Sequence, residues 1–166
     1  MIKQTERTTA IIVTFPVQFL IDIGKPICEG KLSIDKDTAK KYGIPRIRFT
    51  KKGIIAAGYK EFIKQIEFVN SDPEDYWSHI MGNVPTIKES ITHCYINILS
   101  KIRYRAKVIE FQCAPKGEVI TKKFGDGRKM SGKNWVLLHQ FERIKEIKMG
   151  GFQGFRYWKE NYHDTH

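Results

Sequence analysis

Hydrophobic and polar residues alternate most clearly between His93 and Gln112. Odd positions from 101 to 107 are all Lys or Arg, whereas the even positions are mainly apolar: Cys94, Ile96, Ile98, Ser100, Ile102, Tyr104, Ala106 and Val108. An alternation of period two is typical of strands with one buried and one solvated face. We therefore predict two strands, residues 94–99 and 102–111, joined by a tight turn that lacks glycine.

The remaining chain predicts further short elements. Apolar runs predict buried strands over residues 10–15 and 134–141, and a further strand is expected over residues 29–34. Charged–apolar alternation followed by a glycine turn predicts a hairpin of strands 46–50 and 54–59. Short helices are expected over residues 16–24, ending at a glycine, over 35–43, capped by Asp35 or Asp37, and over 76–81. Residues 60–69 fit a helix or a strand, residues 142–147 either continue the preceding strand or turn, and residues 114–133 are loop-like.

Length and charge limit the class of protein. The 166 residues suit a single domain, residues 1–166, and 29 Lys and Arg against 18 Asp and Glu give a net charge of +11, which favours polyanionic partners such as nucleic acid. No run has the length of a transmembrane helix and no signal peptide is recognisable, so we expect a cytoplasmic protein that does not span a membrane. Cys28, Cys94 and Cys113 are widely spaced and predict neither disulfides nor a zinc site.

Two groups of cations are candidates for binding phosphate. Four cations on one strand face repel one another unless water or an anion screens them, so the strand row is either a solvated outer face or a phosphate-binding surface. Residues 125–129, in the loop-like segment 114–133, have no Walker or dinucleotide spacing and are interpreted as a basic hairpin tip. The candidates are Lys101, Arg103, Arg105, Lys107, Lys122, Lys123, Arg128, Lys129 and Lys133.

Aromatic residues near cations are candidates for stacking on bases. Tyr76 and Trp77 lie in a segment bounded by Pro and Gly, and Tyr157 and Trp158 are flanked by Arg156 and Lys159. Rings that stack on bases beside cations that meet phosphates are what single-stranded or flipped-base recognition requires. The alternative is that both clusters are core residues that close the ends of the fold. Trp135 lies in a buried strand and is expected in the core.

The arrangement of these elements resembles the PUA-like superfamily, which includes the ASCH, EVE and YTH domains. ASCH domains carry a glycine, a lysine two positions on, a glutamate five on and an arginine seven on. Gly24, Glu29 and Lys31 stand at the first, third and fourth of these places, whereas Pro26 stands at the second and Lys25 one residue early. Residues 95–111 are similar to the barrel strands of these families, without their preceding Gly-Asp turn, and residues 134–138 resemble a later EVE strand. The resemblance implies an α+β fold, a small mixed, mainly antiparallel β-barrel with a few short helices, that recognises RNA or DNA.

Three function classes follow. The leading hypothesis is a nucleic-acid-binding domain that reads a modified or flipped base in an aromatic pocket, with no cofactor. An alternative is a small hydrolase acting on modified nucleosides or RNA, in which Lys25, Glu29 and Lys31 would activate water and shuttle protons. The third is a protein-interaction module. The histidines show no metal-ligand spacing, and no metal site is predicted.

Overall fold

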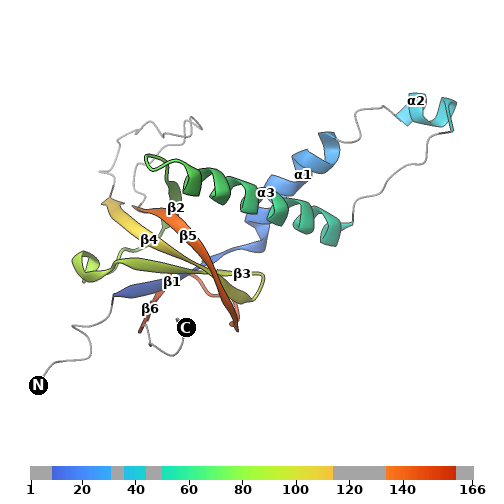
Figure 1. Ribbon diagram of the computed structural model, residues 1–166. Coiled ribbons are helices and arrows are strands. Elements are labelled where there is room, and N and C mark those ends of the chain that lie inside the picture. Colours follow the sequence, from blue (N-terminus) through green and yellow to red (C-terminus); the bar gives the residue numbers. More distant parts are fainter. Residues whose placement is uncertain (1–8, 31–35, 44–49, 114–133, 160–166) are drawn as a thin grey trace, which may run out of the picture. The chain divides into compact units, whose positions relative to one another are not determined.

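The computed structural model describes residues 9–30, 36–43, 50–113 and 134–159 (Figure 1). Its contacts divide the chain into two compact units, which we describe separately: a sheet unit, residues 1–15 and 69–166, and a helical unit, residues 16–68. The single domain predicted over residues 1–166 is therefore described as these two units. The elements are β1 (Ala10–Phe15), α1 (Val17–Gly30), α2 (Lys36–Lys41), α3 (Lys51–Ser71), β2 (Trp77–Met81), the 3-10 helix η2 (Lys88–Ser90), β3 (His93–Ile98), β4 (Lys101–Cys113), β5 (Asn134–Lys148) and β6 (Phe155–Trp158).

The sheet unit is a six-stranded sheet with the order β2-β5-β4-β3-β1-β6. Only β1 and β3 run parallel among the described pairs, and the other four pairs are antiparallel. The expected α+β class with mainly antiparallel strands is therefore confirmed. Within the described residues β2 and β6 are the two edges of the sheet, so the sheet is open.

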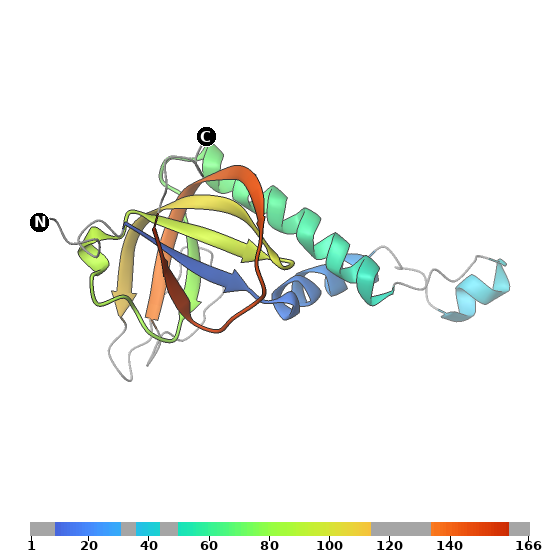
Figure 2. The ribbon, with the colours of Figure 1, turned by 90° about the horizontal axis from the view of Figure 1, so that it is seen from below.

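The open sheet is nevertheless strongly curled (Figure 2). The Phe15 ring on β1 stacks on His79 of β2 with ring centroids 4.6 Å apart, although three strands separate β1 from β2 in the sheet order. The hydroxyl of Tyr157 on β6 lies 3.4 Å from that of Thr86, which follows β2. The curl therefore brings the two edge regions of the sheet near each other.

The two faces of the sheet are identified from the strand register, because residues paired across strands point to the same face. One face, here called the Phe15 face, carries Ile11, Val13, Phe15, Cys94, Ile96 and Ile98. The other, called the His93 face, carries His93 and Tyr95, and on it a small core of Ala10, Ile12, Tyr95 and Ile102 packs against Ile144, Ile147, Met149, Phe152 and Trp158. Strands β1 and β3 are thus buried on both faces, which explains why their sequences are almost continuously apolar.

The predicted central hairpin is confirmed with a tight turn at Leu99 and Ser100, whose φ angles are 55° and 61°. Positive φ at both central residues is the geometry of a type I′ turn, which favours Asn-Gly, so Leu-Ser is an unfavourable pair there.

The prediction that all even positions of β4 share one face is wrong. Tyr104 pairs with Ile96, but Ile102 pairs with Asn97, so β4 has one residue more than β3 between these pairs, Arg103. This β-bulge moves Ile102 to the His93 face, while Tyr104 stays on the Phe15 face. The predicted row of four cations is split for the same reason, and Arg105 and Lys107 are its members on the His93 face.

Several predicted elements are confirmed and others are wrong. Strand 10–15 is confirmed as β1, the helical turn before Gly43 as α2, and strand 134–141 as β5, which continues through residues 142–147 to Lys148. Of the predicted helical turn 76–81, residues 77–81 form the strand β2 instead, because they pair antiparallel with β5. Residues 29 and 30 belong to α1 instead of a strand, and α1 does not end at Gly24. The remainder of the predicted strand 29–34, and residues 46–49 of the predicted hairpin, lie outside the described residues.

The predicted strand 54–59 is instead part of the 21-residue helix α3, which also settles residues 60–69 as helix. The Thr50 side chain caps the helix by accepting a hydrogen bond from the Gly53 amide at 3.0 Å. Ile54, Phe62 and Ile66 then recur at multiples of four residues, the spacing of one helix face. The run IIAAGY is short and apolar, and such runs do not distinguish strand from helix by themselves.

Helices α1 and α3 approach closely at two glycines in the helical unit. A Cβ atom at Gly24 would collide with the Ile54 carbonyl oxygen, and one at Gly58 with the Leu20 carbonyl oxygen. Because each glycine lacks a side chain, the backbone of the other helix can approach it closely. The predicted helix stop at Gly24 is a crossing point instead, and α1 continues beyond it through Pro26.

Candidate nucleic-acid interface

Two transverse rows of side chains cross the His93 face of the sheet. The first, here called the Trp158 row, consists of Trp158, Ala10, His93, Lys107 and His139, each paired in register with the next. The second, the Tyr95 row, consists of Arg156, Ile12, Tyr95, Arg105 and Glu142. Each row spans β6, β1, β3, β4 and β5. The register therefore gathers residues from both ends of the chain on one surface.

The Tyr95 row connects a predicted phosphate-binding cation with a predicted base-stacking ring. The Arg105 guanidinium lies 5.9 Å from the centre of the Tyr95 ring, and Tyr95 lies 5.8 Å from the Trp158 ring. Arg105 also forms an ion pair of 2.9 Å with Glu142. Tyr95 is buried, so it supports these neighbours from below and presents little surface of its own.

The Trp158 row is the more accessible of the two. Lys107 is exposed, and Trp158, His93 and His139 are half-buried. Trp158 packs against the small core, where its indole Nε1 is buried and has no hydrogen-bond partner among the described residues. Part of this ring therefore belongs to the core, as the alternative interpretation held, while part is exposed to solvent.

Hydrogen bonds and charge define the environments of the two histidines in this row. The Thr92 hydroxyl lies 2.8 Å from His93 Nδ1 and 3.2 Å from the Thr9 carbonyl oxygen, to which it donates. Because its one proton is used there, the hydroxyl accepts a hydrogen bond from Nδ1–H of His93. Burial, and secondarily the charge of Lys107, lower the pKa of His139 below its usual value, because both disfavour the charged ring.

The other half of the predicted cation row lies against carboxylates of β5. Glu146 forms ion pairs with Lys101 at 3.0 Å, Arg103 at 2.8 Å and Arg143 at 2.6 Å. The hydrogen bond from Lys101 is the main cause that lowers the pKa of Glu146, and the three positive charges act in the same direction. Residues 101–107 and 142–148 nevertheless carry seven Lys or Arg side chains against two Glu, so the paired strands stay positive.

The remaining aromatic candidates lie away from these rows. Trp77 pairs with Leu138 on the Phe15 face, where its ring stacks on Phe15 at 6.0 Å. Tyr157 is 45% exposed but also points to the Phe15 face, in register with Ile11. Tyr76 is half-buried just before β2. The four rings predicted to stack on bases therefore do not form one pocket in the structure, and Trp158 is the one that shares a row with a predicted phosphate ligand.

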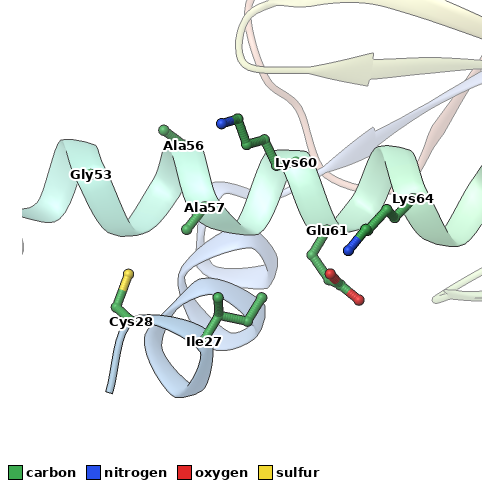
Figure 3. Close-up of a pocket in the computed structure, with 8 residues that line it drawn as sticks. All are labelled: Ile27, Cys28, Gly53, Ala56, Ala57, Lys60, Glu61 and Lys64. Carbon is green, nitrogen blue, oxygen red and sulfur yellow. The ribbon is translucent and has the colours of Figure 1, made fainter. Parts of the chain in front are cut away.

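The other predicted sites are only partly described. Lys122, Lys123, Arg128, Lys129 and Lys133 lie outside the described residues, as does Lys31. Lys25 is exposed on α1, and Glu29 belongs to the last turn of that helix. A hollow between α1 and α3 is lined by Ile27, Cys28, Ala56 and Ala57, with Lys60, Glu61 and Lys64 at its side, and does not include Lys25 (Figure 3).

The sequence analysis did not select His93, Tyr95, His139 or Glu142 of these rows, and it named Arg156 only as a cation beside Tyr157 and Trp158. The sequence contains a signal for His93, because the alternation places it on the same face as Tyr95 and Asn97, opposite the cations of the predicted hairpin. His139 has no such signal, because its place depends on how distant strands pair.

Comparison with known proteins gives no family for this chain: no family model matches, and neither the curated proteins nor the solved structures give a significant match. In the described part of the chain no cluster of His, Cys, Asp or Glu is arranged to hold a metal ion. None of the helices within the described ranges has the length and apolar character needed to cross a membrane.

Proposed function

We propose that the protein binds single-stranded nucleic acid on the His93 face of its sheet. In this proposal a base stacks on the open part of Trp158, while Lys107, Arg105 and Arg156 contact phosphates. A half-buried ring offers one face to an unpaired base, and stacking of this kind does not require a particular base. The cations supply the electrostatic part of the affinity.

The observation that carries the proposal is the Trp158 row. Trp158 and Lys107 were selected from separate stretches of sequence for separate reasons, stacking and phosphate binding, and the register places them on one face in one row. Two strands, β1 and β3, lie between those of Trp158 and Lys107. With about 4.8 Å for each of the three steps between strands, the two residues are about 14 Å apart. A short single strand can span that distance.

The fold that we propose for this function is a PUA-like barrel. The strong curl of the sheet and the approach of Thr86 to Tyr157 support a barrel. The open edges at β2 and β6 are the feature that differs from a closed barrel. We further propose, as these families imply, that the bound base is a modified or flipped one.

Fluorescence anisotropy with single-stranded RNA and DNA of the same sequence, with and without modified bases, tests the proposal. Trp158→Leu should weaken binding by about fivefold to a hundredfold, since stacking contributes about 1–3 kcal/mol per base. Trp77→Leu is the matched control on the opposite face and should bind as the wild type does. Lys107→Ala should weaken all sequences alike.

Thermal melts establish that each variant remains folded, which matters for Trp158 because it packs against the small core. Wild-type protein that fails to bind any strand overturns the proposal. A folded Trp158→Leu variant with full affinity, beside a Trp77→Leu variant that has lost it, would move the site to the Phe15 face.

A further inference from the structure

Two histidines flank a lysine on adjacent strands in the Trp158 row. Lys107 on β4 is paired in register with His93 of β3 on one side and with His139 of β5 on the other. With strands about 4.8 Å apart, the two histidine Cα atoms lie about 10 Å from each other, and the lysine lies midway. A phosphate bound by Lys107 would therefore lie between two imidazole rings.

This is the set of groups that cleavage of an RNA strand by its own 2′-hydroxyl requires. One group removes the proton of the 2′-hydroxyl, a cation stabilises the charge that grows on the phosphoryl oxygens, and another group protonates the departing oxygen. The attacking and leaving oxygens lie on opposite sides of phosphorus, so base and acid have to stand on opposite sides of the cation.

We propose that His139, Lys107 and His93 form a catalytic site that cleaves single-stranded RNA by transesterification. His139 takes the proton from the 2′-hydroxyl, and the bond from O2′ to phosphorus forms. The bond from phosphorus to O5′ breaks, and His93 gives its Nε2 proton to that oxygen. The products are a 2′,3′-cyclic phosphate and a 5′-hydroxyl, and the two histidines end with exchanged protonation states.

The surroundings of the rings support this division of roles. The lowered pKa of His139 keeps the ring neutral near pH 7, as a base must be at the start of the reaction. His93 donates Nδ1–H to the Thr92 hydroxyl, which donates in turn to the Thr9 carbonyl. In the proposal Nδ1 is held by this hydrogen bond, and Nε2 carries the proton that is transferred.

The position of Trp158 determines the polarity in which the RNA would lie across the site. Trp158 lies beyond His93, on the side of the acid, with Ala10 between them. The nucleoside that departs with O5′ is therefore the one whose base stacks on Trp158.

This activity rests on the proposed binding of nucleic acid, so binding and cleavage are measured separately on the full chain. The probes are a 5′-labelled single-stranded RNA, the same strand with one 2′-deoxynucleotide, and the all-DNA strand, each in the presence of EDTA. We expect cleavage of the RNA to a cyclic phosphate, interruption at the deoxynucleotide, and intact DNA. All three strands should bind.

Variants assign the roles. His93→Gln and His139→Gln should each lower the cleavage rate by a hundredfold or more while RNA affinity changes less than about threefold, because general acid–base groups contribute about 10²–10⁴. Lys107→Gln should lower cleavage and affinity together, and Lys107→Arg should restore affinity. Lys64→Gln, an exposed lysine on α3, is the control and should cleave at the wild-type rate.

The results separate the two proposals. Wild-type protein that binds RNA but leaves it intact overturns the catalytic site and leaves the binding proposal standing. Failure to bind any strand overturns both. Cleavage that persists in folded His93→Gln and His139→Gln variants, or that yields 3′-hydroxyl ends, also overturns the assignment.

Discussion

A histidine ring that stacks on phenylalanine is stable there only while it is uncharged. His79 lies against Phe15 with an angle of 13° between the rings, and burial lowers the pKa of His79 to about 4 from 6.5. Burial would remove the hydration of the charged ring, and this loss is the cause of the lowered pKa. His79 is thus a structural residue of the Phe15 face.

This shift predicts a loss of stability in mild acid. Between pH 6.5 and about 4 the unfolded chain takes up a proton at His79 that the folded chain refuses, so the free energy of unfolding should fall as the pH falls through this window. Below about pH 4 the effect of this group should level off. Urea unfolding at a series of pH values measures it, and the slope against pH should be smaller in His79→Gln.

His79→Gln also removes a ring stack, so its stability at pH 7 is expected to be lower. The test therefore lies in the slope and not in the absolute value. An unchanged slope in the variant would show that other groups cause the acid sensitivity.

Single residues were predicted well where burial alone determined the answer. Trp135 was expected in the core and is fully buried, and Cys94 and Ile96 were placed correctly on a buried strand. Trp77 was expected at a ligand and instead stacks on Phe15, 62 residues away in the chain. Its role depends on a tertiary contact that no local pattern encodes.

At the scale of elements, the crossing of α1 and α3 depends on two glycines. Gly24→Ala and Gly58→Ala should each destabilise the helical unit, because the added methyl group meets a backbone carbonyl of the other helix, which cannot move aside as a side chain can. Forcing helices apart in this way costs about 1–3 kcal/mol or more. Thermal or urea unfolding measures the change.

Gly53→Ala is the matched control within α3. Its Cβ would meet only the Thr50 side chain, at 3.4 Å, and alanine is favoured over glycine in a helix by about 1 kcal/mol. This variant should be as stable as the wild type or more so. Equal destabilisation by all three substitutions would mean that the crossing is not the cause.

The errors at this scale have a common origin. The run from Ile54 to Tyr59 and the segment 76–81 are both short and apolar, and their structure is decided by what they pack or pair with: the first extends a capped helix, and the second adds to the edge of β5. The central hairpin was predicted correctly because the alternation of cations and apolar residues from Lys101 to Val108 outweighs such ambiguity. Even there, the alternation did not reveal the bulge at Arg103.

At the scale of the whole molecule, the net charge of +11 predicts a steep effect of salt on nucleic-acid binding. The logarithm of the binding constant should fall linearly with the logarithm of salt concentration, by about 0.7 for each phosphate contacted on a single strand. Lys107→Ala should reduce this slope by about one contact. Lys64→Ala changes the net charge equally from the helical unit and should leave the slope unchanged.

Anisotropy titrations at several salt concentrations give these slopes. Binding that does not vary between low and moderate salt contradicts the electrostatic contacts altogether. Equal reductions from Lys107→Ala and Lys64→Ala would show that overall charge, and not the His93 face, sets the affinity.

The α+β class and the hairpin at the centre of the sheet could be predicted from sequence, whereas the rows on the His93 face could not. Trp158 reaches Lys107 only because β6 pairs with β1, β1 runs parallel to β3, and β3 pairs with β4. The first two of these pairings depend on long-range register, which hydrophobic periodicity does not specify.

The extra residue in β4 makes the length of this strand as important as its composition. Deleting Arg103 would leave a regular ladder in which Ile102 still pairs with Asn97 and Lys101 with Ile98, so every side chain would keep its face. A regular ladder that kept all the residues of β4 would instead pair Arg103 with Asn97, and this cation would take the place of Ile102 in the small core. The bulge therefore keeps a charged side chain out of the core without changing the turn. A relative of this protein that lacks the extra residue can carry the same order of apolar and charged residues next to the turn.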